Sequence, residues 1–345
     1  MTSKIYQIAW CFDVKHGKHL DFFLFSAIMH AMKKALLLLL GMTSSAFAAD
    51  WFDSMIDDTS DFAWTMYSDW HHKLPESGLL PSFFSFETVT NMGERHGAST
   101  LNWQKIGLCV PLADPRRSGG KDWMFNASLN SEITFMDADG EFDLRRNELY
   151  HFSLPISAMV PRDNGDMVIF AVAPAFASDF VHRAHSFHVN LLLSYRVEHS
   201  DSFSYSVGIG HSPDATIMGF MPVFSFDWKM TPEWSMRLSG MRYSIMRDMG
   251  HGLELGVFAD GAGGSWAVST PGGTRMLRVR SLVAGVTAAY DFSRPGETKR
   301  LASLSVGSTL ITSADLCYYN SDLDRVKGHH YHPGLYISGA VDFRF

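Results

Sequence analysis

The sequence predicts an all-β fold: a transmembrane, antiparallel, up-and-down β-barrel of about fourteen strands, with twelve as the alternative count. Three observations lead to this prediction. Apolar and polar residues alternate from residue 82 to the C-terminus, short turns and longer polar connections follow one another, and the last strand ends in Phe. Strict alternation gives each strand two faces in different environments, as in a barrel wall between lipid and a lumen.

The composition excludes several other classes. Charged residues make up 19% of the 345 residues, below the roughly 25% of soluble domains, and aromatic residues make up 13%. A transmembrane helix needs about 20 consecutive apolar residues, and the sequence has no such run. The net charge of −7 argues against a nucleic-acid partner. Cys11, Cys109 and Cys317 are too widely spaced for a zinc site, and we expect no cofactor.

Residues 32–48 have the pattern of a secretory signal peptide. Lys33 and Lys34 are its positive start, an apolar stretch follows, and Ala46-Phe47-Ala48 matches the cleavage site. We therefore expect export and cleavage after Ala48. Signal peptides begin at their positive region, so we interpret Met32 as the start codon and residues 1–31 as an upstream start-site artefact.

A membrane anchor over residues 22–40 is the competing interpretation. The two lysines lie in its middle, where each costs about 2.5–3.5 kcal/mol on insertion scales. The signal peptide is therefore favoured.

Residues 49–80 precede the barrel and do not alternate. They are acidic and carry more aromatic residues than a soluble tail needs. We interpret them as a periplasmic N-terminal segment, and a plug packed into the lumen is the alternative. The aromatic residues are Trp51, Phe52, Phe62, Trp64, Tyr67 and Trp70.

The barrel is predicted to occupy residues 81–345. The pair 233–239 and 241–247 is shorter than the usual 9–11 residues, and without it the count falls to twelve. The predicted strands are 82–91, 100–112, 122–136, 147–160, 166–178, 187–198, 202–210, 216–229, 233–239, 241–247, 252–260, 275–292, 300–311 and 335–345.

Connections on the predicted extracellular side are long and polar, and include 260–273 and 312–333. Aromatic residues gather at the opposite, short-turn ends, where they predict an interfacial girdle. They are Tyr195, Phe203, Tyr205, Phe226, Trp228, Trp234, Tyr290 and Phe292.

The last twelve residues, GLYISGAVDFRF, alternate up to the terminal Phe345. This strand resembles the C-terminal signature of Gram-negative bacterial outer-membrane barrels, including single-domain barrels of unknown function. The resemblance implies that Phe343 and Phe345 belong to the signal read by the barrel-assembly machinery. It also implies location in the outer membrane, in contact with its lipid.

Charged residues on the predicted inner face are the strongest functional lead. They either line a water-filled pore and set its selectivity, or pair with one another across a closed lumen. The residues are Lys105, Glu132, Arg196, Asp227, Lys229, Arg237, Asp291, Asp342 and Arg344.

Two other groups are weaker. His329, His330 and His332 could bind a transition metal, but histidines of a solvated loop are the commoner explanation, so no metal site is predicted. His151 and Ser153 match no nucleophile motif, so no catalytic residue is predicted. We therefore expect a narrow porin-like channel for small hydrophilic solutes. A non-conducting structural or surface-interaction barrel is the alternative, and an outer-membrane lipid or polysaccharide enzyme is least favoured.

Overall fold

The fold is known from a computed structural model that describes residues 82–95, 97–113, 124–138, 142–162, 165–181, 185–211, 220–239, 242–293, 300–318 and 325–343. All lie in the second of two units, Asp58–Phe345. Among these residues, no helix is long and apolar enough to cross a membrane. The predictions for residues 1–31, 32–48 and 49–80, and for Arg344 and Phe345, fall outside the described ranges.

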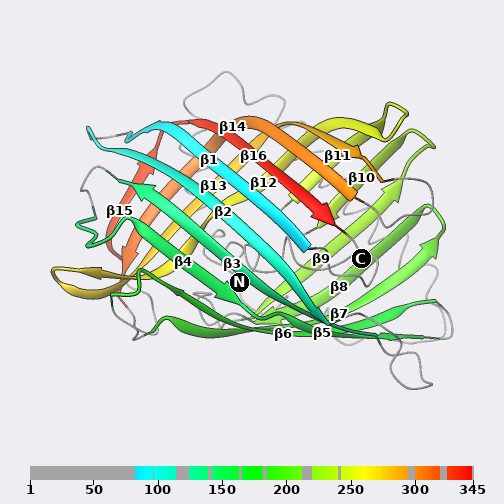
Figure 1. The fold of residues 1–345 in the computed structure, drawn as a ribbon, viewed down its shortest axis with the longest axis horizontal. Coiled ribbons are helices and arrows are strands. Elements are labelled where there is room, and N and C mark those ends of the chain that lie inside the picture. Colours follow the sequence, from blue (N-terminus) through cyan, green and yellow to red (C-terminus); the bar gives the residue numbers. More distant parts are fainter. Residues whose placement is uncertain are drawn as a thin grey trace, which may run out of the picture. The chain divides into compact units, whose positions relative to one another are not determined.

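The alternating segments form strands of one antiparallel sheet (Figure 1). Most bounds agree with the predicted ones within a few residues. The strands are β1 (Ser82–Gly93), β2 (Thr100–Ala113), β3 (Met124–Asp137), β4 (Glu148–Ser153), β5 (Ile156–Pro161), β6 (Met167–Ser178), β7 (Phe187–Ser200), β8 (Phe203–His211), β9 (Phe220–Lys229), β10 (Trp234–Ser239), β11 (Arg242–Asp248), β12 (Leu253–Thr270), β13 (Gly273–Asp291), β14 (Arg300–Cys317), β15 (Arg325–Tyr331) and β16 (Leu335–Phe343).

The sheet closes on itself as a barrel. Strand β1 pairs with β16, β16 with β14, and β14 with β13, which joins the two ends of the sequential series. Strands β4 and β5 share one place because both pair with β3 and β6. The ring therefore has fourteen strand positions, as predicted. The short strands β10 and β11 lie in the wall between β9 and β12.

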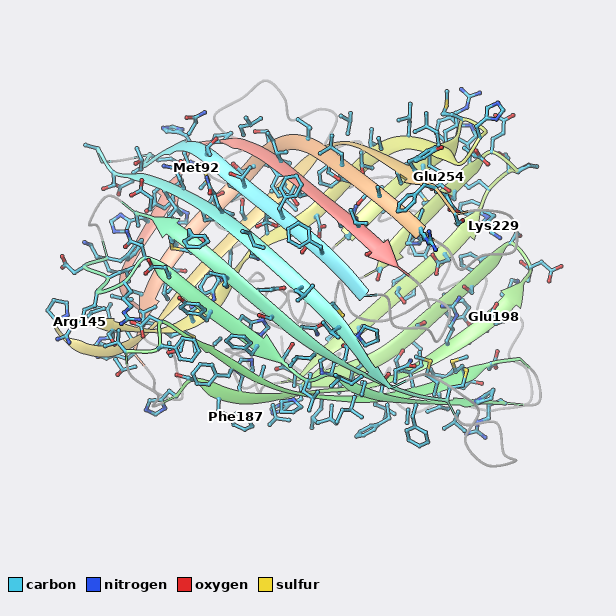
Figure 2. The ribbon with its side chains drawn as sticks, in the orientation of Figure 1. Met92, Arg145, Phe187, Glu198, Lys229 and Glu254 are labelled. Atoms are coloured by element: carbon cyan, nitrogen blue, oxygen red, sulfur yellow. The ribbon has the colours of Figure 1, made fainter. Side chains whose placement is uncertain are left out.

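The two faces of the wall have the predicted opposite character. On β7, Leu191, Leu193 and Tyr195 are exposed, whereas Leu192 and Ser194 between them are buried. Figure 2 shows Phe187 at the outer face of this strand, where 67% of the residue is exposed. Such an apolar outer face is the lipid-facing surface of a transmembrane barrel. Its further members include Phe84, Phe86, Ile106, Leu108, Val110, Leu129, Phe170, Val207, Ile209, Leu255, Val257, Val286, Leu304, Val306 and Leu335.

The barrel has two different ends. We call the end with Ser82 and Phe343 the terminal end; Glu198, Lys229 and Glu254 lie there (Figure 2). The other, with Met92 and Arg145, is the distal end.

The prediction of loops over 260–273 and 312–333 was wrong for most of these residues. Strand β12 continues to Thr270, β14 continues to Cys317, and β15 returns beside it. The polar residues of these extensions bond to one another across the strands: Ser281 and Thr312 are 2.7 Å apart, and Arg280 pairs with Asp315. Strands whose polar residues pair in this way lack the alternation from which the other strands were predicted.

The distal extensions of β12, β13 and β14 form a cap. Strand β12 pairs with β11 up to Ala259 and then crosses to β6, where Ala267 pairs with Ser178. Asp179 fixes this junction, because its carboxylate accepts a hydrogen bond from the Ser269 N–H at 2.7 Å. Gly263 lies in the crossing segment with φ of +116°, and a Cβ there would be 2.1 Å from a backbone oxygen. Only glycine is suited to this conformation.

The distal end is therefore a second, narrower ring. It runs β12–β6–β4–β3–β2–β1–β15–β14–β13 and bypasses β7 to β11. Strand β15 closes it against the end of β1, where the His332 N–H donates to the Gly93 carbonyl at 2.7 Å. The wall thus narrows from fourteen positions to this smaller circuit.

Candidate functional site

The interior of the narrower ring is filled by one apolar core. Its members come from every strand of that ring, and each is at most 6% exposed. Apolar side chains in contact across a ring fill its interior, as in small barrels filled by side chains. The largest are Trp103, Trp266, Tyr331, Phe142 and Phe258.

A polar layer lies next to this core on the inner face. The Lys105 ammonium donates to the Gly263 carbonyl at 2.8 Å and lies 3.8 Å from the Glu87 carboxylate. Glu87 also accepts a hydrogen bond from the Trp103 indole at 2.8 Å. Lys105 therefore joins strand β2 to the cap. Beside it, Arg242 lies 3.7 Å from the buried Asp260.

Three of the predicted inner-face charges come together nearer the terminal end. The Arg237 guanidinium donates to Asp227 at 2.6 Å, and Arg196 lies 4.0 Å from the same carboxylate. Half of the Arg237 side chain is exposed, so this group is in contact with solvent. Solvent screening makes such a pair worth about 0–1 kcal/mol.

The other predicted inner-face charges lie apart from this group. Glu132 lies 3.5 Å from His151, whose ring stacks on His188 at 6.4 Å. Asp291 accepts hydrogen bonds from Ser293 in the following turn. The register places Lys229 and Asp342 on the inner face as well.

The predicted girdle residues lie on outer-face positions near the terminal end. Phe203 is the centre of a ring cluster, with Tyr205, Phe226 and Trp228 at 5.9–6.4 Å. The Tyr195 hydroxyl donates to Asp166 at 2.5 Å. Trp234 packs under the Arg247 guanidinium at 5.6 Å, and Tyr290 and Phe292 are exposed.

Of the three histidines that were weak metal candidates, His329 has structural contacts. His329 lies on β15, with Nδ1 2.5 Å from the Glu94 carboxylate and its ring edge-on to Phe142. His330 is the next residue of the strand, so its side chain lies on the opposite face of β15 from that of His329. Within the described ranges, no three His, Cys, Asp or Glu side chains gather as a metal site.

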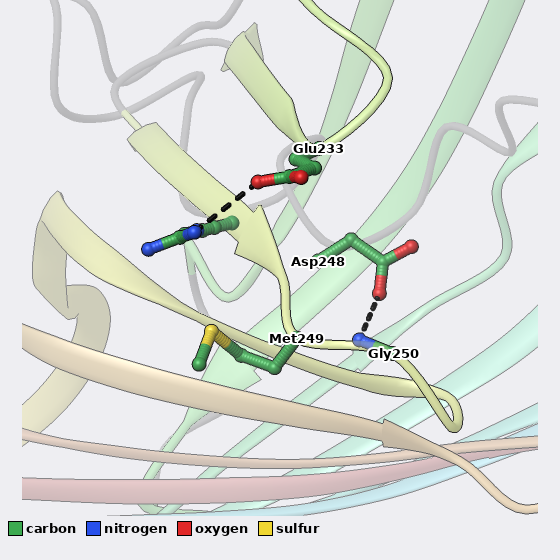
Figure 3. A pocket seen from close by; sticks show the side chains of 5 residues that line it. Glu233, Asp248, Met249 and Gly250 are labelled. Atoms are coloured by element: carbon green, nitrogen blue, oxygen red, sulfur yellow. Dashed lines mark hydrogen bonds and ion pairs between the residues drawn. The ribbon is translucent and has the colours of Figure 1, made fainter.

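A surface hollow lies at the turns of the terminal end (Figure 3). Glu233, Arg247, Asp248, Met249 and Gly250 line it. The Glu233–Arg247 pair at 3.2 Å is exposed, and the Asp248 carboxylate accepts a bond from the Gly250 N–H in a local turn. These contacts stabilise the turns and gather no catalytic set.

The sequence interpretation missed Glu87, Asp260 and Arg242. Alternation within 82–91 does place Glu87 on the inner face, beside Lys105. Asp260 was assigned to a loop, so its inner position next to Arg242 could not be derived.

No family model and no curated protein matches the sequence. Several solved structures resemble the fold. The toluene transporter TodX of Pseudomonas putida has a TM-score of 0.33 and 10% identity over 79% of this chain and 90% of that one. A deltaS2 mutant of the TodX monoaromatic hydrocarbon channel has a TM-score of 0.32 and 9% identity, over 77% and 89%. The β domain of the Bordetella autotransporter Brka has a TM-score of 0.22 and 9% identity, over 77% and 99%. By its own strand pairing and its two opposite faces, this chain is a transmembrane β-barrel of the outer-membrane type.

Proposed function

We propose that this protein is a non-conducting outer-membrane barrel, closed to the free diffusion of hydrophilic solutes. The observation that carries the proposal is the apolar core of the narrower ring. Ions that cross it would lose their hydration among Trp, Leu and Val side chains, which is costly without compensating polar partners. We further propose that it reaches the membrane after cleavage behind Ala48 and is assembled through its C-terminal strand, with Phe343 and Phe345.

A narrow porin-like channel for small hydrophilic solutes is the second candidate. The solvent-exposed charges Arg196, Asp227 and Arg237 on the inner face favour it, because such groups set selectivity in water-filled lumens. For this function the cap would have to move away from the distal end.

Single-channel recording in a planar bilayer distinguishes the two. We expect the refolded mature chain, residues 49–345, to insert without conductance steps. A variant in which Asn-Gly replaces residues 262–281 should conduct, because Gly261 and Leu282 are paired and a two-residue turn can connect them. Phe187→Ala, at an exposed distal site outside the core, should stay silent. Regular steps from the unaltered chain would favour the channel instead.

A further inference from the structure

One stretch of the inner wall is buried although its residues are short. It lies on β3, β5 and β6, towards the terminal end, and we call it the small-residue patch: Asn126, Ser128, Asn130, Ser157, Ala171 and Ala173. Each of these residues is at most 6% exposed. The register makes them neighbours, since Asn126 pairs with Ser157 and Ser157 with Ala171.

The patch residues cannot cover one another. Inner-face neighbours in a sheet stand side by side, and Ala and Ser side chains do not reach over the next strand. Met159 and Leu192 at the edge of the patch project further and are still only 2% exposed. On the β11 side of the same lumen, Met246 is half-buried. The covering groups must therefore approach from inside the lumen.

The patch also carries polar atoms that need hydrogen-bond partners. Both amide atoms of Asn126, the Ser128 hydroxyl and the Asn130 amide oxygen are buried without a hydrogen bond. Buried polar groups are normally paired, so whatever covers the patch should offer donors and acceptors. A stretch of polypeptide backbone provides both in regular succession.

We propose that the segment of this chain before β1, residues 58–81, occupies the lumen against the small-residue patch. The chain enters β1 at the terminal end. Phe83 on β1 pairs with Cys109 on β2, and Cys109 pairs with Asn130 of the patch, so the segment enters the barrel two strands away from the patch. The segment supplies aromatic residues for the alanine surface, among them Trp64 and Trp70.

Charge complementarity supports the same occupant. The segment carries four acidic residues against one lysine: Asp58, Asp61, Asp69 and Glu76, against Lys73. On the adjoining inner wall of β7, β9 and β10, the three cations Arg196, Lys229 and half-exposed Arg237 outnumber the carboxylates Glu198 and Asp227 with which the arginines pair. A segment lying against the patch would thus have its apolar groups near β6 and its carboxylates near these cations.

The test uses the mature chain, folded in vesicles, with Cys109 and Cys317 replaced by Ser and a single cysteine introduced as Ser128→Cys. A benzophenone maleimide attached there should, on irradiation, cross-link to peptides from residues 58–81. The matched control is Ser225→Cys, on the inner face of β9 and partly exposed. It should give a lower yield of these adducts.

A second measurement does not depend on the attached probe. Labelling of the Ser128→Cys thiol by a water-soluble maleimide should be slow in the mature chain. It should rise by about an order of magnitude when residues 49–80 are deleted, as expected when a local cover is removed. Ser225→Cys should show little change, and a heat-dependent gel shift identifies the folded fraction.

Adducts only within the barrel strands, or equal labelling with and without the segment, would overturn the proposal. Protection that persists after the deletion would assign the patch to another occupant, such as a polar solute, and would also overturn it. The labelling reports on the inner wall, so its outcome is separate from the conductance that tests the proposed function.

Discussion

At the scale of single residues, Lys105 connects the barrel wall to the cap. Its ammonium bonds to the Gly263 carbonyl and lies beside Glu87, both inside the barrel. Lys105→Met should lower the free energy of unfolding by about 1–3 kcal/mol, since the carbonyl and the carboxylate lose a charged donor. Urea unfolding in lipid vesicles measures this change. Lys229→Met, at an exposed inner-face position, should change stability by less than about 0.5 kcal/mol. Equal urea midpoints for the two variants would contradict the role of Lys105 in connecting the barrel wall to the cap.

Alternation placed Lys105 on the inner face but could not identify its partner. Gly263 lies 158 residues further along the chain. The contact exists because β12 leaves β11 and crosses the distal end, and no local pattern of residues encodes such a crossing. The Arg237–Asp227 pair is different, because these residues are register partners on the neighbouring strands β10 and β9.

At the scale of strands, the apolar outer face is a property of whole elements. Val257, Val286 and Val306 lie side by side on β12, β13 and β14, all exposed. Val286→Arg should destabilise the inserted barrel by about 2–4 kcal/mol if this row lies near the middle of the bilayer. Ser303→Arg, on the inner face of β14, is the matched control and should have little effect on stability. The folded fraction on unheated gels and the urea midpoint report both changes, and equal losses would contradict the assignment of faces.

Strands were predictable where one face meets lipid and the other the lumen. That condition fails beyond Ala259 on β12 and beyond Thr309 on β14, where both faces are buried. Arg278, Arg280 and Asp315 there are as buried as Leu277 and Val279. A mixed polar and apolar sequence resembles a loop, so the extensions were assigned as connections.

At the scale of the whole barrel, fourteen strand positions could be predicted because each strand pairs with its sequence neighbours. The narrower ring could not, because it depends on one parallel contact between β12 and β6. Sequence order therefore predicted the wide ring and its inner charges. The apolar core that carries the proposed function depends on how the narrower ring closes at the distal end.

Closure of the wide ring has its own test at the seam between the first and last strands. Ser85 on β1 is the register partner of Ala340 on β16. Directly opposed residues have Cβ atoms about 4.5–5.5 Å apart, close to what a disulfide requires. With the native cysteines replaced, Ser85→Cys with Ala340→Cys should therefore cross-link under mild oxidation.

The product would enclose nearly the whole barrel in one covalent loop and so change its mobility on denaturing gels. Ser303 pairs with Ala340 from the other side and lies two strand spacings, about 9–10 Å, from Ser85. Ser85→Cys with Ser303→Cys should therefore stay unlinked. A sheet that remained open at this seam would give no cross-link in either pair. Linkage of both pairs to the same extent would show a wall too mobile for the fixed register, so only the selective result supports a closed barrel.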